Sequence, residues 1–135
     1  MKSPPGSTAA TPSATADLDG VVVPNRGGLR PQAQRRIREY VLAHLQENIS
    51  IRTLATLVDL SESHFVRAFK QSVGVTPHRF LLQCRVMRVQ QLLVETDLPV
   101  AEIALATGFS DQSHCALRFR ELVGITPSRY RWLMR

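Results

Sequence analysis

The 135-residue sequence lacks several features that mark large protein classes. Aromatic residues make up only 6% of it, and no apolar run approaches the roughly 20 residues that span a bilayer. The N-terminal stretch MKSPPGSTAATPSATAD has no apolar segment of the kind that directs secretion. We therefore expect a cytoplasmic protein with no membrane partner.

Cysteine is scarce too, and Cys84 and Cys115 lie far apart, outside any Cys-x-x-Cys spacing. The sequence therefore signals no disulfide framework, and two isolated thiols on apolar faces are typical of a reducing compartment. His64 and His114 could join the cysteines as metal ligands, but neither spacing nor helix face supports a four-ligand site. We expect no metal and no cofactor.

Signals for catalysis are equally weak. The pair Ser–His occurs twice, at 63–64 and 113–114, and could suggest a nucleophile beside its base. Adjacent residues on a helix do not face each other, and there is no glycine-rich phosphate loop. The sequence therefore predicts a protein that is not an enzyme.

Positive charge is what the sequence has in excess. With 17 Lys and Arg against 11 Asp and Glu, the formal net charge is +6 and the pI is about 10.3. The hydrophobic content of 44% is ordinary for a folded domain. The charge indicates an anionic partner, either nucleic acid or an anionic membrane surface, unless it is only solvated surface charge.

Composition divides the chain into two parts. Residues 1–30 are rich in Pro, Ser, Thr, Ala and Gly, which predicts a disordered arm or linker. From Pro31 onward, apolar stripes and turn residues predict seven helices and no strand. The expected helices cover 31–48, 51–58, 62–73, 77–96, 99–107, 111–123 and 127–135.

Caps and stripes support these helices. The expected N-caps are Ser50, Ser61, Thr76, Ser110 and Thr126. The expected core stripes are Ile37, Tyr40, Val41 and Leu45 in the first helix, and Leu82, Val86, Val89 and Leu93 in the long one.

One part of this pattern occurs twice. KQSVGVTPHRF at 70–80 is matched by RELVGITPSRY at 120–130. The similarity extends over 54–80 and 103–130, with one extra residue in the second copy. The chain therefore contains two copies of one helical unit, joined by the helix 77–96.

Each copy has the features of a helix-turn-helix. A small residue precedes the turn residue by four positions, Ala55 before Asp59 and Ala104 before Gly108. Two helices that cross closely need the small residue, and the turn residue tolerates a left-handed backbone. The core-facing residues expected on the second helices are Phe65, Phe69 and Val73 in the first copy, and Cys115, Phe119 and Val123 in the second.

The opposite faces of these second helices carry mixed polar and small apolar residues. They are Ser63, His64, Val66, Arg67, Lys70 and Gln71 in the first copy, and Gln112, Ser113, His114, Ala116, Leu117 and Arg120 in the second. A helix fits the DNA major groove, where such polar groups bind base edges or phosphates and small apolar groups meet thymine methyls. Two such helices on a basic chain indicate DNA binding.

These residues resemble the DNA-binding domain of the AraC/XylS family of bacterial transcription factors. The resemblance covers about 31–135 and rests on SESHFVRAFKQSVGVTPHRFL and LPVAEIALATGFSDQSHCALRFRELVGITPSRYR. It implies an all-α fold of two tandem helix-turn-helix units, about 31–76 and 97–135, on a linker helix of about 77–96. It also implies a nucleoid-associated regulator that reads two successive major grooves of double-stranded DNA, commonly as an activator that contacts RNA polymerase.

The resemblance assigns roles to individual residues. Base contacts are expected from Ser63, His64, Val66 and Arg67, and from Gln112, Ser113, Ala116 and Leu117. Phosphate contacts are expected from Lys70, Arg79, Arg118, Arg120 and Arg129, although Arg79 and Arg129 could equally be solvated. The order Leu117–Arg118 departs from the family's usual Arg–apolar order. Leu117 would then meet a thymine-rich step, or Arg118 would turn to a phosphate, or the second unit would bind more weakly.

Two questions of assembly stay open at this stage. The chain either acts alone as a monomer on DNA or is the DNA-binding part of a larger regulator. The alternative function is a protein-interaction module that docks on RNA polymerase or another regulator with reduced DNA reading. An Arg67→Ala variant separates the two, because only a DNA reader should lose affinity and sequence preference.

Overall fold

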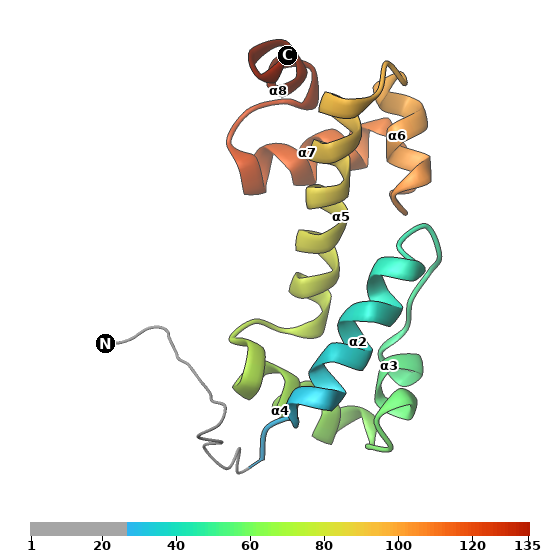
Figure 1. The fold of residues 1–135 in the computed structure, drawn as a ribbon, viewed down its shortest axis with the longest axis vertical. Helices are drawn as coiled ribbons and strands as arrows, with labels where there is room; N and C mark the ends of the chain where they lie inside the picture. Colours follow the sequence, from blue (N-terminus) through green and yellow to red (C-terminus); the bar gives the residue numbers. More distant parts are fainter. Residues whose placement is uncertain (1–26) are drawn as a thin grey trace, which may run out of the picture.

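The computed structural model describes residues 27–135, which form two helical units joined by one long helix (Figure 1). The helices are α2 (Pro31–Ala43), α3 (Ile51–Leu57), α4 (Glu62–Val73), α5 (Pro77–Glu95), α6 (Val100–Ala106), α7 (Gln112–Val123) and α8 (Pro127–Met134). The predicted all-α class with seven helices is confirmed, with no strand within 27–135. None of these helices is long and apolar enough to cross a membrane.

Most helices begin at the predicted capping residues, and two end at glycines. The hydroxyls of Ser50, Ser61, Thr76 and Thr126 each accept a hydrogen bond from the backbone N–H three residues later. Gly74 and Gly124 end α4 and α7 with φ of 92° and 98°, a left-handed conformation that only glycine adopts freely. The two copies of the repeat therefore begin and end their helices by the same local chemistry.

Most boundaries lie within one residue of the prediction, but one helix end and one N-cap differ from it. The first helix ends at Ala43, because the chain turns over His44–Glu47 and brings Leu45 and Ile49 into the core. The N-cap of α7 is Asp111, whose carboxylate accepts from the His114 N–H at 2.8 Å. Ser110, the predicted cap, is the extra residue of the second copy and lies in the turn. A carboxylate stabilises a helix N-terminus more strongly than a hydroxyl does, since it also carries charge.

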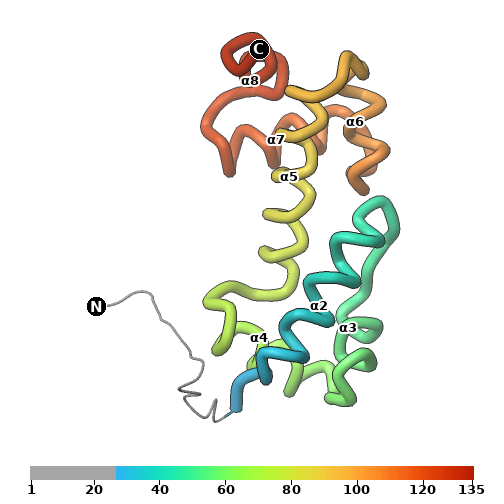
Figure 2. The backbone as a smooth tube through the Cα atoms, in the orientation of Figure 1, coloured from blue at the N-terminus to red at the C-terminus, as the bar shows by residue number. Residues whose placement is uncertain are grey.

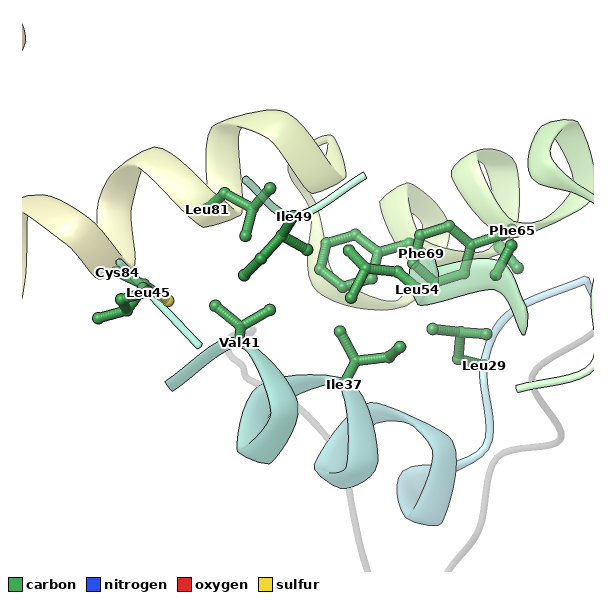
Figure 3. Packing of buried hydrophobic residues seen from close by; sticks show 12 residues of the cluster. Leu29, Ile37, Val41, Leu45, Ile49, Leu54, Phe65, Phe69, Leu81 and Cys84 are labelled. Atoms are coloured by element: carbon green, nitrogen blue, oxygen red, sulfur yellow. The ribbon is translucent and has the colours of Figure 1, made fainter. Parts of the chain in front are cut away.

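Each unit has its own hydrophobic core. The first contains Leu29, Ile37, Val41, Leu45, Ile49, Leu54, Ala55, Phe65, Ala68, Phe69, Leu81 and Cys84, most of which are labelled in Figure 3. The second contains Val86, Val89, Leu93, Ile103, Ala104, Phe109, Cys115 and Phe119. Tyr40, Leu82, Val73 and Val123 are partly buried against these cores. The predicted inward stripes are therefore confirmed.

The repeat is also visible in the aromatic packing. Phe69 meets Phe80 edge-on with ring centroids 5.4 Å apart, and Phe119 meets Tyr130 in the same way at 5.5 Å. Edge-to-face contacts of this kind add to the stabilisation from burial. Phe80 and Tyr130 thus pack, partly buried, against the first and second cores.

The linker helix α5 runs through both units (Figure 2) and contributes side chains to both cores. Leu81 and Cys84 belong to the first core, and Val86 and Val89 belong to the second. The sequence stripe of α5 captured only the second of these faces. The first face was not predicted, because the pattern search identified one apolar stripe in this helix, whereas α5 has two apolar faces.

The folded region starts slightly before Pro31. Leu29 is buried in the first core, and its backbone N–H donates to the Ser72 hydroxyl at 2.7 Å. Residues 1–26 of the expected arm lie outside the described residues.

Candidate nucleic-acid interface

The turn in each unit places the second helix against the first. Asp59 and Gly108 adopt φ of 57° and 94°, and the next N–H in each turn donates back to Ala55 and Ala104 at 3.0 Å. Both alanines are buried, so the helices cross where their side chains are small. This predicted geometry is confirmed, and it leaves one face of α4 and one face of α7 open to solvent.

The open face of α4 carries exposed Ser63, His64, Arg67 and Lys70. Val66 is partly buried against the first core, so only part of its side chain is available to a ligand. Neither Arg67 nor Lys70 has an ion-pair or hydrogen-bond partner for its side chain among residues 27–135. The face therefore presents the two unpaired cations beside Ser63 and His64.

The open face of α7 is less charged. Gln112, Ser113 and Arg120 are exposed, Ala116 is partly buried, and Leu117 is 55% exposed. Leu117 stands two residues before Phe119, as Arg67 stands two residues before Phe69, so the two occupy equivalent positions. An exposed leucine at this position gives the second face an apolar centre where the first has a guanidinium.

Arg118 lies on another side of α7 than Ser113 and Leu117. Its counterpart in the first unit, Ala68, is buried, whereas Arg118 donates to Glu121 at 2.9 Å. Since successive helical residues point about 100° apart, Arg118 shares its side with His114 and Glu121. It is therefore already paired, and it stands apart from the other candidates of this helix.

The remaining phosphate candidates stand at helix starts. Arg79 and Arg129 are the third residues of α5 and α8, and both side chains are exposed. Arg129 also lies over the Trp132 ring, 5.2 Å from its centroid, and this ring is 71% exposed. The positive end of each helix dipole lies beside these arginines and adds to their attraction for an anion such as a phosphate.

Comparison with known proteins gives a consistent result. A family profile described as a helix-turn-helix domain matches residues 54–132. An AraC-type regulator structure from Chromobacterium violaceum shares 30% identity at a TM-score of 0.72, covering 76% of this chain and 92% of that one.

This chain belongs to the AraC-type family of helix-turn-helix DNA-binding domains. The resemblance found in its motifs is thereby confirmed, and the family is one of DNA-binding domains and not a class of enzymes.

Two further relatives of this AraC-type domain are informative. The DNA-binding domain of AdpA, a global transcriptional factor solved with a target DNA, shares 31% identity at a TM-score of 0.70, covering 73% of this chain and 89% of that one. The probable transcriptional regulator LumQ of Photobacterium leiognathi is 37% identical over 99 residues, which are 73% of this chain and 40% of LumQ. The chain thus spans less than half the length of LumQ.

Several arginines of this AraC-type domain hold the fold together. Arg85 donates to the Leu45 and Glu47 carbonyls, and Arg131 donates to the Leu93 and Thr96 carbonyls, at 2.9–3.1 Å. Sequence reasoning treated neither as functional or structural. For Arg85 a signal existed in the repeat, because it stands eight residues after Pro77, as Arg135 stands eight residues after the matched Pro127. Arg135 also donates to the Thr96 carbonyl, at 3.0 Å.

A cleft of about 420 Å³ lies where the two units meet. It is lined by Asn48, Ile49, His78, Leu81, Leu82, Arg85, Gly108, Phe109, His114 and Arg118. The sequence did not predict it, because its walls come from segments far apart in the chain.

Other chemistry has little support in the described part of the domain. No group of three or more His, Cys, Asp or Glu residues there could hold a metal ion. Burial raises the pKa of Cys84 and raises that of Cys115 to about 11, so both thiols stay protonated at neutral pH. The histidine of the second Ser–His pair lies 3.3 Å from the Ser110 hydroxyl, measured from its Nδ1.

Proposed function

We propose that this chain is the DNA-reading part of a transcriptional regulator, and that α4 and α7 enter two successive major grooves of double-stranded DNA. The observation that carries the proposal is the equivalence of the two helices. Each is held on its unit by a buried phenylalanine, Phe69 or Phe119, and each exposes matched polar positions on the opposite side. The AdpA domain, which is similar over most of this chain, was solved with its target DNA.

Affinity in this proposal comes mainly from phosphate contacts. Lys70 and Arg120 lie at equivalent positions near the ends of α4 and α7, while Arg79 and Arg129 lie at the starts of the helices that follow. Cations at these four positions would neutralise phosphates along the groove edges and release counterions. Such contacts fix the register of the domain but carry no sequence information.

Specificity comes from the central residues of the two open faces. Arg67 suits guanine, whose O6 and N7 accept two hydrogen bonds, and Ser63 and His64 can bond neighbouring base edges. On α7, Gln112 suits adenine, Ser113 suits either acceptor or donor, and Leu117 suits a thymine methyl. Val66 and Ala116 add small apolar contacts. The second unit is therefore expected to prefer an A/T-rich half-site.

Arg118 is the weakest of the proposed phosphate ligands. It would have to leave Glu121 before it could reach the backbone, and exposed ion pairs of this kind contribute about 0–1 kcal/mol. DNA could therefore recruit it at little cost, but no free cation is presented there beforehand.

The partners beyond DNA follow the same proposal. We expect a monomer on DNA, unless the chain is part of a larger protein, and we expect it to contact RNA polymerase. The exposed Trp132, Leu133 and Met134 of α8 offer an apolar surface for such a contact. Chemistry on a substrate is not expected of the domain.

The test is selection of bound duplexes from a random DNA pool, followed by a salt titration on the selected sequence. The proposal predicts a motif of two halves about one helical turn apart, and affinity that falls steeply with salt. Weak binding to every sequence, without a motif, would favour the interaction-module alternative.

A further inference from the structure

The two cores of the domain adjoin along the middle of α5. Leu82 is partly buried against the second core, while Cys84 is the last α5 residue buried in the first core and Val86 is the first buried in the second, so Arg85 stands between them. Within residues 27–135, α5 is the one helix that contributes to both cores. If the two units were joined only by α5, bending or twisting of this helix would change their relative orientation. A second contact between the units is therefore needed to hold that orientation.

Arg85 makes one side of that contact. Its Nε donates to the Leu45 carbonyl at 3.1 Å, and its Nη2 donates to the Glu47 carbonyl at 2.9 Å. Both carbonyls belong to the turn that follows α2, so the guanidinium ties the middle of α5 to the first unit. The Arg85 side chain is partly buried, and this burial lowers its pKa.

Gly108 of the second unit lies against the same two residues, Leu45 and Arg85. Figure 1 shows the turn after α6 lying next to the turn after α2. A Cβ placed on Gly108 would lie 2.1 Å from the Leu45 carbonyl oxygen and 2.6 Å from Arg85 Nε. The first of these atoms is backbone and cannot rotate away. The two units therefore touch at a place where even a methyl group does not fit.

This close approach is separate from the backbone conformation of Gly108. Gly74 and Gly124 have nearly the same φ, 92° and 98° against 94°, yet nothing lies within 4 Å of a Cβ built on either. The domain thus contains two glycines required by conformation alone, and one that is also required by contact between the units.

We propose that Leu45, Arg85 and Gly108 form a joint that fixes α4 relative to α7 and so sets the half-site spacing that the domain accepts. This proposal rests on the proposed function. Each added base pair turns a half-site by roughly 35° and moves it by about 3.4 Å. A rigid joint rejects such a change, whereas a loosened joint lets the second unit follow its half-site.

The experiment compares three duplexes that carry the selected site with its own spacing, with one base pair inserted, and with one removed. Binding by fluorescence anisotropy is measured for the wild type, Gly108→Ala and Arg85→Met. For the wild type we expect each altered spacing to cost about tenfold or more in affinity. For both joint variants we expect this penalty to fall to about threefold or less, with the affinity for the first half-site alone unchanged.

Gly74→Ala and Gly124→Ala are the matched controls, because they impose the same left-handed strain without the clash. We expect both to keep the wild-type spacing penalty. Circular dichroism and thermal melts establish which variants are folded. If Gly108→Ala is unfolded, Arg85→Met decides, since it keeps the glycine backbone and the aliphatic stem of the arginine.

The outcomes separate the joint from the function on which it rests. A folded joint variant that keeps the full spacing penalty overturns the joint. A wild type that binds all three spacings equally also overturns it, while leaving DNA reading intact. A wild type that selects no site at all contradicts the proposed function itself.

Discussion

Arg85 and Arg135 make the same tertiary contact in the two units. Arg85 Nη2 donates to the Glu47 carbonyl at 2.9 Å, and Arg135 Nη1 donates to the Thr96 carbonyl at 3.0 Å. Each arginine stands eight residues after the proline of a Thr–Pro turn, and each donates to a carbonyl in the segment that follows an earlier helix, α2 for Arg85 and α5 for Arg135. The internal repeat therefore extends from sequence and helix caps to the long-range contacts that close each unit.

The reading role of Arg67 predicts a specific defect. Arg67→Ala removes an unpaired cation from the centre of the α4 face. We expect discrimination between the selected duplex and a scrambled one to fall by about 1–3 kcal/mol. Anisotropy titrations on both duplexes measure it.

Arg36→Ala is the matched control, because it removes the same charge from an exposed position on α2. It should leave the ratio of the two affinities unchanged. Equal loss of specificity in both variants would mean that Arg67 acts only through net charge.

Leu117→Arg should give the second unit the cation that the first unit already has. We expect affinity for the selected duplex to rise and the slope of log K against log salt to steepen by about 1. A repeated selection should also show a changed second half-motif, since an apolar contact is replaced by hydrogen-bond donors.

Arg118→Ala tests the neighbouring position. Because Arg118 is paired with Glu121 on another side of α7, the base preference of the second half-site should stay as in the wild type. A loss of that preference would show that Arg118, and not Leu117, reads the base.

The cap of α7 gives a stability prediction with a built-in control. Asp111→Ala removes the carboxylate that accepts from the His114 N–H, and should lower the free energy of unfolding by about 1 kcal/mol. Ser110→Ala, one residue earlier, should change it by about 0.5 kcal/mol at most. Urea denaturation followed by circular dichroism measures both. The reverse order of the two effects would restore Ser110 as the cap.

Cys115 predicts how stability depends on pH in the alkaline range. Its folded pKa of about 11 lies above the free-thiol value of 9.0, so the folded state holds the proton more tightly than the unfolded state. This contribution is complete below pH 9 and is lost as the pH rises from 9 towards 11. Thermal melts over this range should show the fall, and Cys115→Ala should reduce it. Cys84, whose pKa burial also raises, accounts for a remainder.

The same burial predicts slow thiol chemistry. Native protein at pH 8 should react with a disulfide reagent such as Ellman's reagent far more slowly than protein unfolded in urea. Rapid reaction of both thiols in the native state would contradict their placement in the two cores.

Much of the fold was predictable because its signals are local. Thr76–Pro77 and Thr126–Pro127 specify helix starts, Gly74 and Gly124 specify helix ends, and the three-to-four-residue spacing of apolar side chains specifies the buried faces. The exposed position of Arg67 follows from the same periodicity, since it lies opposite Phe65 and Phe69. Its contact with DNA stays a prediction.

The features that could not be predicted from the sequence are of two kinds. One is a choice between two residues that can play the same role, and the other is a contact between residues far apart in the chain. Ser110 and Asp111 can both cap a helix, and a one-residue insertion conceals which of them does. The contact of Arg85 with Leu45 joins residues 40 positions apart, and the approach of Gly108 to both is set only when two units pack on one helix. Local periodicity carries no information about such contacts.

The most direct test of DNA reading by both units is missing-base interference on the selected duplex. Removal of single bases reports contacts at A and T positions as well as at G and C, so the pattern shows where both helices contact the duplex. If both helices read DNA, two patches of interference lie about 10 base pairs apart. In Arg67→Ala, only the strongest position of the first patch is lost. A single patch in the wild type would contradict DNA reading by both units, because one of the two helices would then lie outside the groove.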